Sequence, residues 1–499
     1  MPRDPPVTST VRSAVSFIKA LYRSFQGYAS VLCISRSIGL DRSVHERLIG
    51  CVSRVKTGAS APRHRCRWES LVDTQRTTAP PRVHPAKVAF ASFIGTAIEW
   101  YDFFLFGTAA TLVFNEQFFP TLSPAAGTLA AFATFGVAFL ARPLGGVVFG
   151  HFGDRLGRKR MLVLSLMLMG AATVAIGLLP TYAQIGLAAP ALLVVCRFVQ
   201  GIAVGGEWGG AVLMAVEHAP PRRRAFYGSW PQAGVPAGLV LSASAFFAIE
   251  QLPDEQVTAW AWRLPFLASI LLVLLGLYVR LQVIESPDFE RVRQSRSAFP
   301  LGEVLRTSRK SLLIGLCTQA AANIPFYIVT VFVLSYGPSE LGVSRDTILL
   351  CLMAACVLDI GSVPLVATFA DRVGRRTVLL AGAVYMAAIA FPFFWLFDTA
   401  SPWLILVGMI LVVTVGHAVT YAAIAGFLAE LFPARVRYTG ASVAYQAGGM
   451  VTSGPAPFVA GALFGVAGGS WVLAVYIVVA CAVTFGALLA ADRDSGSDR

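Results

Sequence analysis

The chain has 499 residues, of which 56% are hydrophobic and only 13% are charged. A soluble globular chain of this length does not have such a composition, so the protein belongs in a membrane. The net charge of +13 is concentrated in residues 1–85, which carry +9. The basic residues of the remainder lie in short loops, which argues against a nucleic-acid-binding protein.

Residues 1–85 are rich in Arg and Ser and are interrupted by prolines. We expect a basic, disordered extension, because no run in it is long or apolar enough for a signal peptide or a membrane span. Three explanations stay open. The segment is a tail that touches anionic lipid, a transit peptide, or the product of a start site assigned upstream of true initiation near Val72.

Twelve apolar runs follow, each of about 20 residues or more, enough to cross ~30 Å of hydrocarbon as a helix. They cover 87–114, 126–150, 161–180, 187–216, 225–249, 263–284, 310–336, 346–370, 377–397, 402–429, 439–467 and 470–490. We predict an all-α membrane protein with twelve transmembrane helices in two six-helix halves. The halves are residues 86–285 and 310–491, joined by a cytoplasmic linker over 286–309 and followed by a polar tail over 492–499.

The connections between these runs alternate in charge. Clusters such as Arg222 to Arg224 and Arg372 to Arg376 lie on one side, whereas the other side carries mostly Asp and Glu. Short loops rich in Lys and Arg remain in the cytoplasm. We therefore expect both termini to be cytoplasmic, in a multi-pass protein of the inner, cytoplasmic membrane.

A charged motif between the second and third runs, Gly150-His-Phe-Gly-Asp-Arg-Leu-Gly-Arg-Lys-Arg160, recurs as Ala367-Thr-Phe-Ala-Asp-Arg-Val-Gly-Arg-Arg376. Asp154 corresponds to Asp371 at an offset of 217 residues. Such an internal repeat indicates two similar halves. A second repeated segment, at an offset of 213 residues, relates Glu217 after the fourth run to Glu430 after the tenth.

These motifs resemble the signature of the major facilitator superfamily. Thr96-Ala-Ile-Glu-Trp-Tyr-Asp-Phe-Phe104, Arg197-Phe-Val-Gln-Gly201 and Gly205-Gly-Glu-Trp-Gly-Gly210 further resemble the metabolite:proton symporter family, whose members carry shikimate, 2-oxoglutarate, citrate, or proline and betaine. The resemblance covers roughly residues 86–491 and implies the major facilitator fold. It does not fix the substrate.

The repeated motif is expected to form a cytoplasmic gate rather than a ligand site. Its acids and bases can pair with each other or with helix C-terminal carbonyls, and these links would break when the halves rock. The alternative is that the motif only determines topology. The predicted gate residues are Gly150, Asp154, Arg155, Gly157, Arg158, Lys159, Glu217, Asp371, Arg372, Gly374, Arg375, Arg376 and Glu430.

A few ionisable residues lie near the middle of the predicted spans. Burying such a group costs at least ~2.5–3.5 kcal/mol, so each is a candidate functional residue. We predict an acid–base cluster of Glu99 or Asp102 with Arg142, and with Glu207 close by. One of its acids would take up the coupled proton, and Arg142 would hold a substrate carboxylate.

The repeat extends this hypothesis to the second half. Asp359 occupies the position equivalent to Arg142, so the two are expected to face each other across a central cavity, where Asp359 would take a proton or a cationic group. Gln319 is equivalent to Asp102. Asn323 and Tyr327, four and eight residues after Gln319, are expected to lie on the same helix face. The other predicted cavity residues are Tyr101, Trp208, Gln232, Asn323, Tyr327 and Gln446. For each polar residue the alternative is a structural hydrogen bond between helices. We favour this alternative for Gln319, Asn323, Gln232, Gln446 and His417, and a structural pair for Arg197.

We therefore predict a secondary transporter that imports a small, carboxylate-bearing or zwitterionic metabolite with protons by alternating access. No ATP-binding GxxxxGK[ST] motif occurs, so the expected energy source is the proton gradient, without a cofactor. The eight cysteines show no metal-ligand spacing, and no nucleophile constellation indicates an enzyme. We expect a monomer in the lipid bilayer. A uniporter or exporter, or a non-transporting sensor with the same fold, stays open.

Overall fold

The computed structural model describes residues 85–156, 158–207, 212, 215–216, 219–220, 223–282, 300–433 and 436–491. These residues belong to one compact unit, Val83–Arg499. Within the described ranges no strand occurs, and twelve helices are long and apolar enough to cross a membrane. The predicted all-α fold with twelve spans is confirmed.

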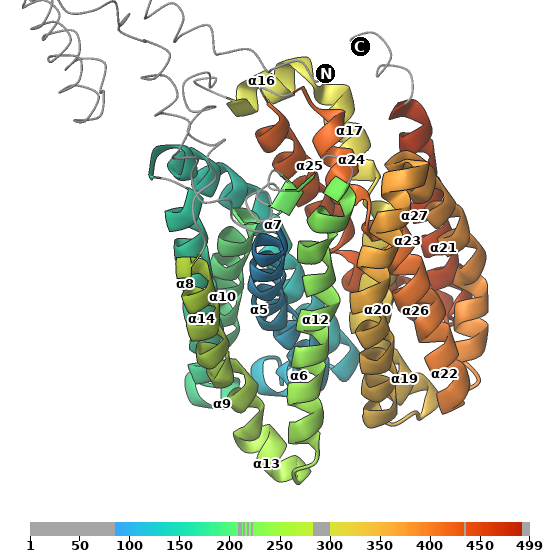
Figure 1. Cartoon of the computed structure of the whole chain (residues 1–499). Helices are drawn as coiled ribbons and strands as arrows, with labels where there is room; N and C mark the ends of the chain where they lie inside the picture. The colour runs from blue at the N-terminus through green and yellow to red at the C-terminus, as the bar shows by residue number, and fades with distance from the viewer. Residues whose placement is uncertain are drawn as a thin grey trace, which may run out of the picture. The chain divides into compact units, whose positions relative to one another are not determined.

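The first six spans are single helices over most of their length, with short helices in the connections (Figure 1). The span helices are α5 (Pro85–Leu112), α7 (Pro124–Leu156), α8 (Arg158–Leu178), α10 (Ala188–Gly205), α12 (Arg224–Glu250), and η3 (Ala261–Arg263) with α14 (Leu264–Gln282). The connections contain α6 (Phe114–Phe118), α9 (Tyr182–Ile185) and α13 (Asp254–Ala259).

The last six spans include three that are built from several segments. The seventh is α17 (Arg309–Cys317), α18 (Ala320–Tyr327), η4 (Ile328–Phe332) and α19 (Val333–Leu341), preceded by α16 (Pro300–Thr307). The eighth and ninth are α20 (Arg345–Val373) and α21 (Arg375–Phe397). The rest are α22 (Pro402–Met409), η5 (Ile410–His417), α23 (Ala418–Tyr421) and α24 (Ile424–Leu431), then α25 (Arg437–Thr452) with α26 (Ala456–Ala467), and α27 (Trp471–Ala490).

Two helix pairs make the most extensive contacts between the first six spans and the last six. In Figure 1 α12 runs between the two groups of helices, where it packs against α5 on one side and α20 on the other. The second pair is α7 with α25. The main contacts between the halves thus come from the second, fifth, eighth and eleventh spans.

The α7–α10 contact depends on glycine. A Cβ atom added at Gly201 would overlap the backbone carbonyl of Ala138, and one added at Gly205 would overlap the carbonyl of Arg142. Small residues let two membrane helices approach this closely. Because α10 presses directly on the turn that carries Arg142, it fixes the position of that side chain.

Candidate functional site

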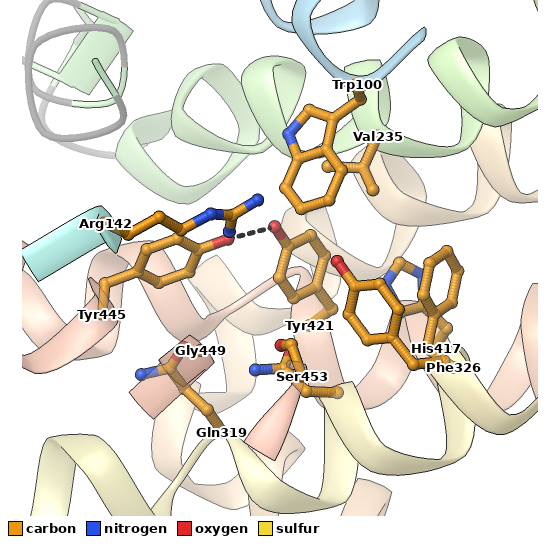
Figure 2. Close-up of a pocket in the computed structure, with 12 residues that line it drawn as sticks. Trp100, Arg142, Val235, Gln319, Phe326, His417, Tyr421, Tyr445, Gly449 and Ser453 are labelled. Atoms are coloured by element: carbon orange, nitrogen blue, oxygen red, sulfur yellow. Dashed lines mark hydrogen bonds between the residues drawn. The ribbon is translucent and has the colours of Figure 1, made fainter. Parts of the chain in front are cut away.

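A cavity lies between the two groups of spans. The first six spans contribute Trp100 from α5, Arg142 from α7 and Val235 from α12. The remaining lining residues come from the second half and are mostly aromatic or polar: Gln319, Asn323, Phe326, Tyr327, His417, Tyr421, Tyr445, Gly449 and Ser453. Figure 2 shows these side chains converging from both halves. The cavity volume is about 10 Å³, close to that needed for one water molecule.

Arg142 is the cation of this cavity, and its exposed fraction is only 2%. Its guanidinium carbon lies 4.0 Å from the ring centroid of Phe139, 4.5 Å from that of Phe103 and 5.1 Å from that of Trp100. Among the described residues, Nε and Nη2 have no hydrogen-bond partner. Aromatic faces stabilise the cation but leave its in-plane donors available. A carboxylate that enters the cavity can therefore accept hydrogen bonds from Arg142.

Phenol groups stand beside this guanidinium. The hydroxyls of Tyr421 and Tyr445 form a 2.7 Å hydrogen bond with each other, drawn as the dashed line in Figure 2. Tyr327 also lines the cavity, and its ring packs edge-on against Phe139 with centroids 5.5 Å apart. These hydroxyls add donors and acceptors next to a fixed positive charge, as a hydroxylated anion requires.

An Asp–His pair forms part of the opposite wall. Nδ1 of His417 lies 2.7 Å from Oδ2 of Asp359. The imidazole ring stacks between Phe326 and Tyr421, at centroid distances of 4.2 and 4.6 Å. His417 lines the cavity and Asp359, which is fully buried, does not. The imidazole therefore lies between the carboxylate and the cavity.

A second buried ionic cluster lies within the first half, around Arg280 of α14. Its Nη2 is 2.9 Å from the carboxylate of Glu99, and the same group contacts Glu207. Arg280 also donates to the carbonyl of Leu162, and the hydroxyl of Ser165 donates to Glu207 over 3.1 Å. None of these residues lines the cavity. The cluster therefore joins α5, α8 and α14 to the residues after α10.

The side-chain contacts of the repeated charged motif are described for its copy in the second half. Arg375 pairs with Glu430 and lies 3.7 Å from Asp371. Arg376 donates to the carbonyl of Leu488 near the C-terminal end of α27, over 2.8 Å. The carboxylate of Asp371 accepts hydrogen bonds from the first backbone amides of α12, at 3.0 and 3.1 Å. This end of the molecule is thus held by links within and between the halves.

A sequence model with the description "Major Facilitator Superfamily" matches residues 92–454 and 339–498 of this chain. The chain belongs to the major facilitator superfamily. It is 44% identical over 404 residues to the "Shikimate transporter" of Escherichia coli strain K12, covering 80% of this chain and 92% of that protein. It is 34% identical over 372 residues to the "Proline/betaine transporter" of the same strain, covering 72% and 74% of the two chains.

Solved structures agree on the fold. The crystal structure of a D-xylose-proton symporter matches with a TM-score of 0.63 at 20% identity, covering 80% of this chain and 97% of that one. The family match, the transporter relatives and the twelve spans together make this chain a multi-pass membrane transporter and not an enzyme. The resemblance inferred from the sequence motifs is confirmed.

The structure corrects the predicted cluster of this facilitator around Arg142. Glu99 and Glu207 lie near each other, as expected, but their cation is Arg280 and not Arg142. The reason is helical periodicity: Trp100 faces the cavity, so the preceding Glu99 points about 100° away, toward α14. Sequence reasoning missed Arg280, although it is charged and lies within an apolar run.

The predicted position of Asp359 is also corrected. It does not face Arg142 across open space, because the ring of His417 stands between it and the cavity. His417, for which the sequence favours a structural role, lies on the cavity wall. Asp102 is fully buried and lies outside the cavity lining, with Thr173 as a polar neighbour.

The remaining predicted cavity residues divide into two groups. Gln319, Asn323 and Tyr327 line the cavity. Gln319 and Asn323 also donate hydrogen bonds between helices, to the Ala444 carbonyl and the Thr452 hydroxyl, each over 2.9 Å. Tyr101, Gln232 and Gln446 do not line it: the Tyr101 hydroxyl donates to the carbonyl of Pro265, and the Gln446 amide donates to the carbonyl of Gly205. These are the hydrogen bonds between helices that we considered as the alternative. Gln232 is buried within α12.

Several predicted residues lie beyond what the structure describes. Trp208, Glu217 and Gly157 are outside the described residues, and for Gly150, Asp154, Arg155, Arg158 and Lys159 only the helical backbone is described. In the second half Gly374 has a positive φ of 103° between α20 and α21, and Arg372 is exposed. Within the described ranges no cluster of three or more His, Cys, Asp or Glu residues could hold a metal ion.

Proposed function

We propose that this transporter carries a small, hydroxylated or zwitterionic carboxylate together with protons across the inner membrane, by alternating access around the central cavity. The observation that carries the proposal is Arg142: a buried guanidinium with unused donors, set among hydroxyl and amide groups between the two halves. Shikimate, proline and betaine, named in the titles of the relatives, all carry a carboxylate, which such a group would bind.

The cavity favours a hydroxylated acid over a betaine. A quaternary ammonium group would have to share a small space with the charge of Arg142, which repels it. Hydroxyl groups of a substrate, by contrast, find partners in Tyr421, Tyr445 and Asn323, all of which line the cavity. A shikimate-like compound is therefore the first substrate to test.

Proton coupling is proposed because ionisable groups are held inside the spans. Glu99, Asp102 and Asp359 are all buried, and carboxylates kept at such depth commonly mark proton pathways in transporters. The concentration of Lys and Arg in the loops on one side of the predicted spans supports a cytoplasmic location for both termini. The cavity lies within a single chain, which supports a monomer as the transporting unit.

The alternating-access proposal is supported by the ion pairs and hydrogen bonds at the end of the molecule where α12 begins. Asp371 links the two halves by accepting hydrogen bonds from the first amides of α12, and it is supported by Arg375, which pairs with Glu430 in the same half. We place this closed end at the cytoplasmic face, where movement of one half against the other would break the hydrogen bonds of Asp371 and open the cavity. The remaining motif residues, from Gly150 to Glu217, are proposed to act in the same way.

The test is uptake of radiolabelled shikimate and glycine betaine into proteoliposomes with and without an inward proton gradient. Arg142→Gln should lower the apparent affinity for shikimate by about 10- to 100-fold, because a charge-assisted hydrogen bond contributes about 1.5–3 kcal/mol. Arg142→Lys should recover part of the loss, since it restores the charge but not the planar fork. Arg345→Gln, a substitution of an exposed arginine, is the matched control and should behave as wild type.

Other outcomes favour other functions. Uptake that is unaffected by the gradient and unaccompanied by alkalinisation of the medium would indicate a uniporter. Binding of shikimate without exchange across the membrane would indicate a sensor. Normal shikimate transport by Arg142→Gln would contradict the assigned anchor.

A further inference from the structure

The Asp359–His417 pair suggests where the coupled proton is held. It spans two helices of the second half, since Asp359 lies on α20 and His417 ends the π-helical segment η5. We propose that His417, oriented by Asp359, is the group that binds the transported proton next to the substrate. This inference rests on the proposed function as a proton-coupled carboxylate transporter, and it assigns the proton site within it.

The carboxylate is fixed on both of its oxygens. Oδ2 of Asp359 binds Nδ1 of His417, and Oδ1 accepts a 2.9 Å hydrogen bond from the hydroxyl of Ser362. That hydroxyl also lies 2.9 Å from the carbonyl of Thr414 on η5. A carboxylate held in this way orients an imidazole and stabilises its protonated form, which leaves the second ring nitrogen to exchange a proton.

The ring itself is held rigidly on the cavity wall. Phe326 and Tyr421 stack on its two faces at interplanar angles of 27° and 23°. The exposed fraction of His417 is 3%, and it lines the cavity with these two rings. Its position at the end of a π-helical turn fits the pattern that such turns frequently mark functional sites.

The groups that face the pair differ in the pH range at which their residue types ordinarily exchange protons. The described groups that face them are Arg142 on α7, Tyr327 on α18, Tyr421 on α23, Tyr445 on α25, and Cys356 one turn away on α20. Arginine and tyrosine ordinarily keep their protons well above neutral pH, and cysteine loses its proton above pH 8. Histidine is the side chain whose ordinary titration falls between pH 5 and 8.

The location explains how the proton and substrate would be coupled. A substrate carboxylate held by Arg142 shares the cavity with His417, and an imidazolium attracts that negative charge. Each ligand therefore strengthens the binding of the other, by the same factor in both directions. The proton enters on the imidazole, crosses with the substrate, and returns to water when the substrate leaves.

The Arg280 cluster is the competing location. Glu99 and Glu207 share one guanidinium there, so one of the two carboxylates could also take up a proton. These residues lie outside the cavity lining, so a proton bound there would not meet the substrate. The geometry therefore favours the Asp–His pair, and an experiment separates the two.

The experiment compares two reactions of labelled shikimate in proteoliposomes: exchange at equal pH on both sides, which needs no net proton movement, and accumulation driven by an inward proton gradient. His417→Gln keeps a hydrogen bond to Asp359 but cannot be protonated. We expect it to lower gradient-driven accumulation at least tenfold and to weaken the apparent affinity for shikimate, while exchange at saturating shikimate stays within threefold of wild type. Asp359→Asn should show the same separation.

Asp398→Asn is the matched control. This carboxylate of the second half binds the hydroxyls of Tyr336 and Ser470 away from the cavity, and its substitution should leave both reactions unchanged. Gradient-driven accumulation of shikimate by the wild-type protein tests the proposed function without reference to His417. If the wild-type protein does not accumulate shikimate, the proposed function is refuted, and that outcome is distinct from a failure of the His417 assignment. Normal accumulation by His417→Gln would overturn the assignment. So would loss of both reactions in correctly inserted His417→Gln and Asp359→Asn, or the same separation produced by Glu99→Gln instead.

Discussion

The carboxylate of Asp371 accepts a 3.0 Å hydrogen bond from the backbone amide of Ala225. Asp371 lies near the end of α20 in the second half, and Ala225 is in the first turn of α12 in the first half. The first amides of a helix have no partner within the helix, and the helix dipole makes that end attractive to a negative charge. The contact therefore links the halves where they must separate for the cavity to open on this side.

Asp371→Asn should destabilise the closed state of this end. The charge–dipole interaction contributes about 1 kcal/mol, so the population open on this side should rise about fivefold. The measurement is the alkylation rate of Gly449→Cys in a background with the native cysteines replaced by serine. Gly449 lines the cavity, and an added Cβ there meets nothing closer than 3.7 Å. Asp346→Asn, at the opposite end of α20, is the control, and equal rates in all variants would contradict the gate.

Arg280→Gln should destabilise the protein strongly. It would leave Glu99 and Glu207 buried without their cation, and breaking a buried ion pair costs about 3–5 kcal/mol. Thermal unfolding in detergent should show a clear fall in Tm. Arg280→Gln combined with Glu207→Gln should recover part of it, because one uncompensated carboxylate is removed. A Tm equal to that of wild type in the single variant would show that the cluster does not contribute to stability.

Gly205→Ala should disturb both the α7–α10 contact and the cavity. The new methyl group would overlap the carbonyl of Arg142, so α7 must move and carry the guanidinium with it. We expect a lower Tm together with at least tenfold weaker shikimate uptake. Gly486→Ala on α27 meets no atom within 4 Å and should behave as wild type. An unchanged Tm for Gly205→Ala would mean that the helix contact tolerates separation.

Tyr445→Phe should discriminate between substrates. It removes a hydroxyl that is hydrogen-bonded to Tyr421 at the cavity wall, and a neutral hydrogen bond contributes about 0.5–1.5 kcal/mol. The apparent affinity for shikimate should fall about two- to tenfold, with little effect on a substrate without hydroxyl groups. Competition assays with both compounds provide the measurement. Tyr385→Phe removes a hydroxyl that bonds to the Leu411 carbonyl and serves as the control.

The fold could be predicted from the sequence because it depends on the lengths of apolar runs and on a repeated motif, both of which can be read directly from the residues. Runs of about 20 apolar residues set the number of spans, and the repeated motif around Asp154 and Asp371 revealed the two halves. The interruptions could not be predicted. The π-helical segments Ile328–Phe332 and Ile410–His417 are mostly apolar, like the α-helical parts of the same spans, so their composition does not distinguish a wide turn from an ordinary one.

The candidate site was predicted in part. Arg142, Gln319, Asn323 and Tyr327 line the cavity, and they were found from depth and from the repeat. The ion-pair partner of each buried acid could not be predicted, because it depends on how each helix is rotated about its axis. Glu99 and Trp100 are adjacent in sequence, yet Glu99 pairs with Arg280 whereas Trp100 lines the cavity. His417 was undervalued for the same reason, because its contact with Asp359 joins residues 58 positions apart.

The cavity is small, at about 10 Å³, and aromatic side chains surround it. Around Arg142 the described side chains leave room for about one water molecule, so a metabolite cannot bind while they keep this arrangement. The aromatic side chains must therefore move apart in every transport cycle, and the free-energy cost of that separation recurs each time.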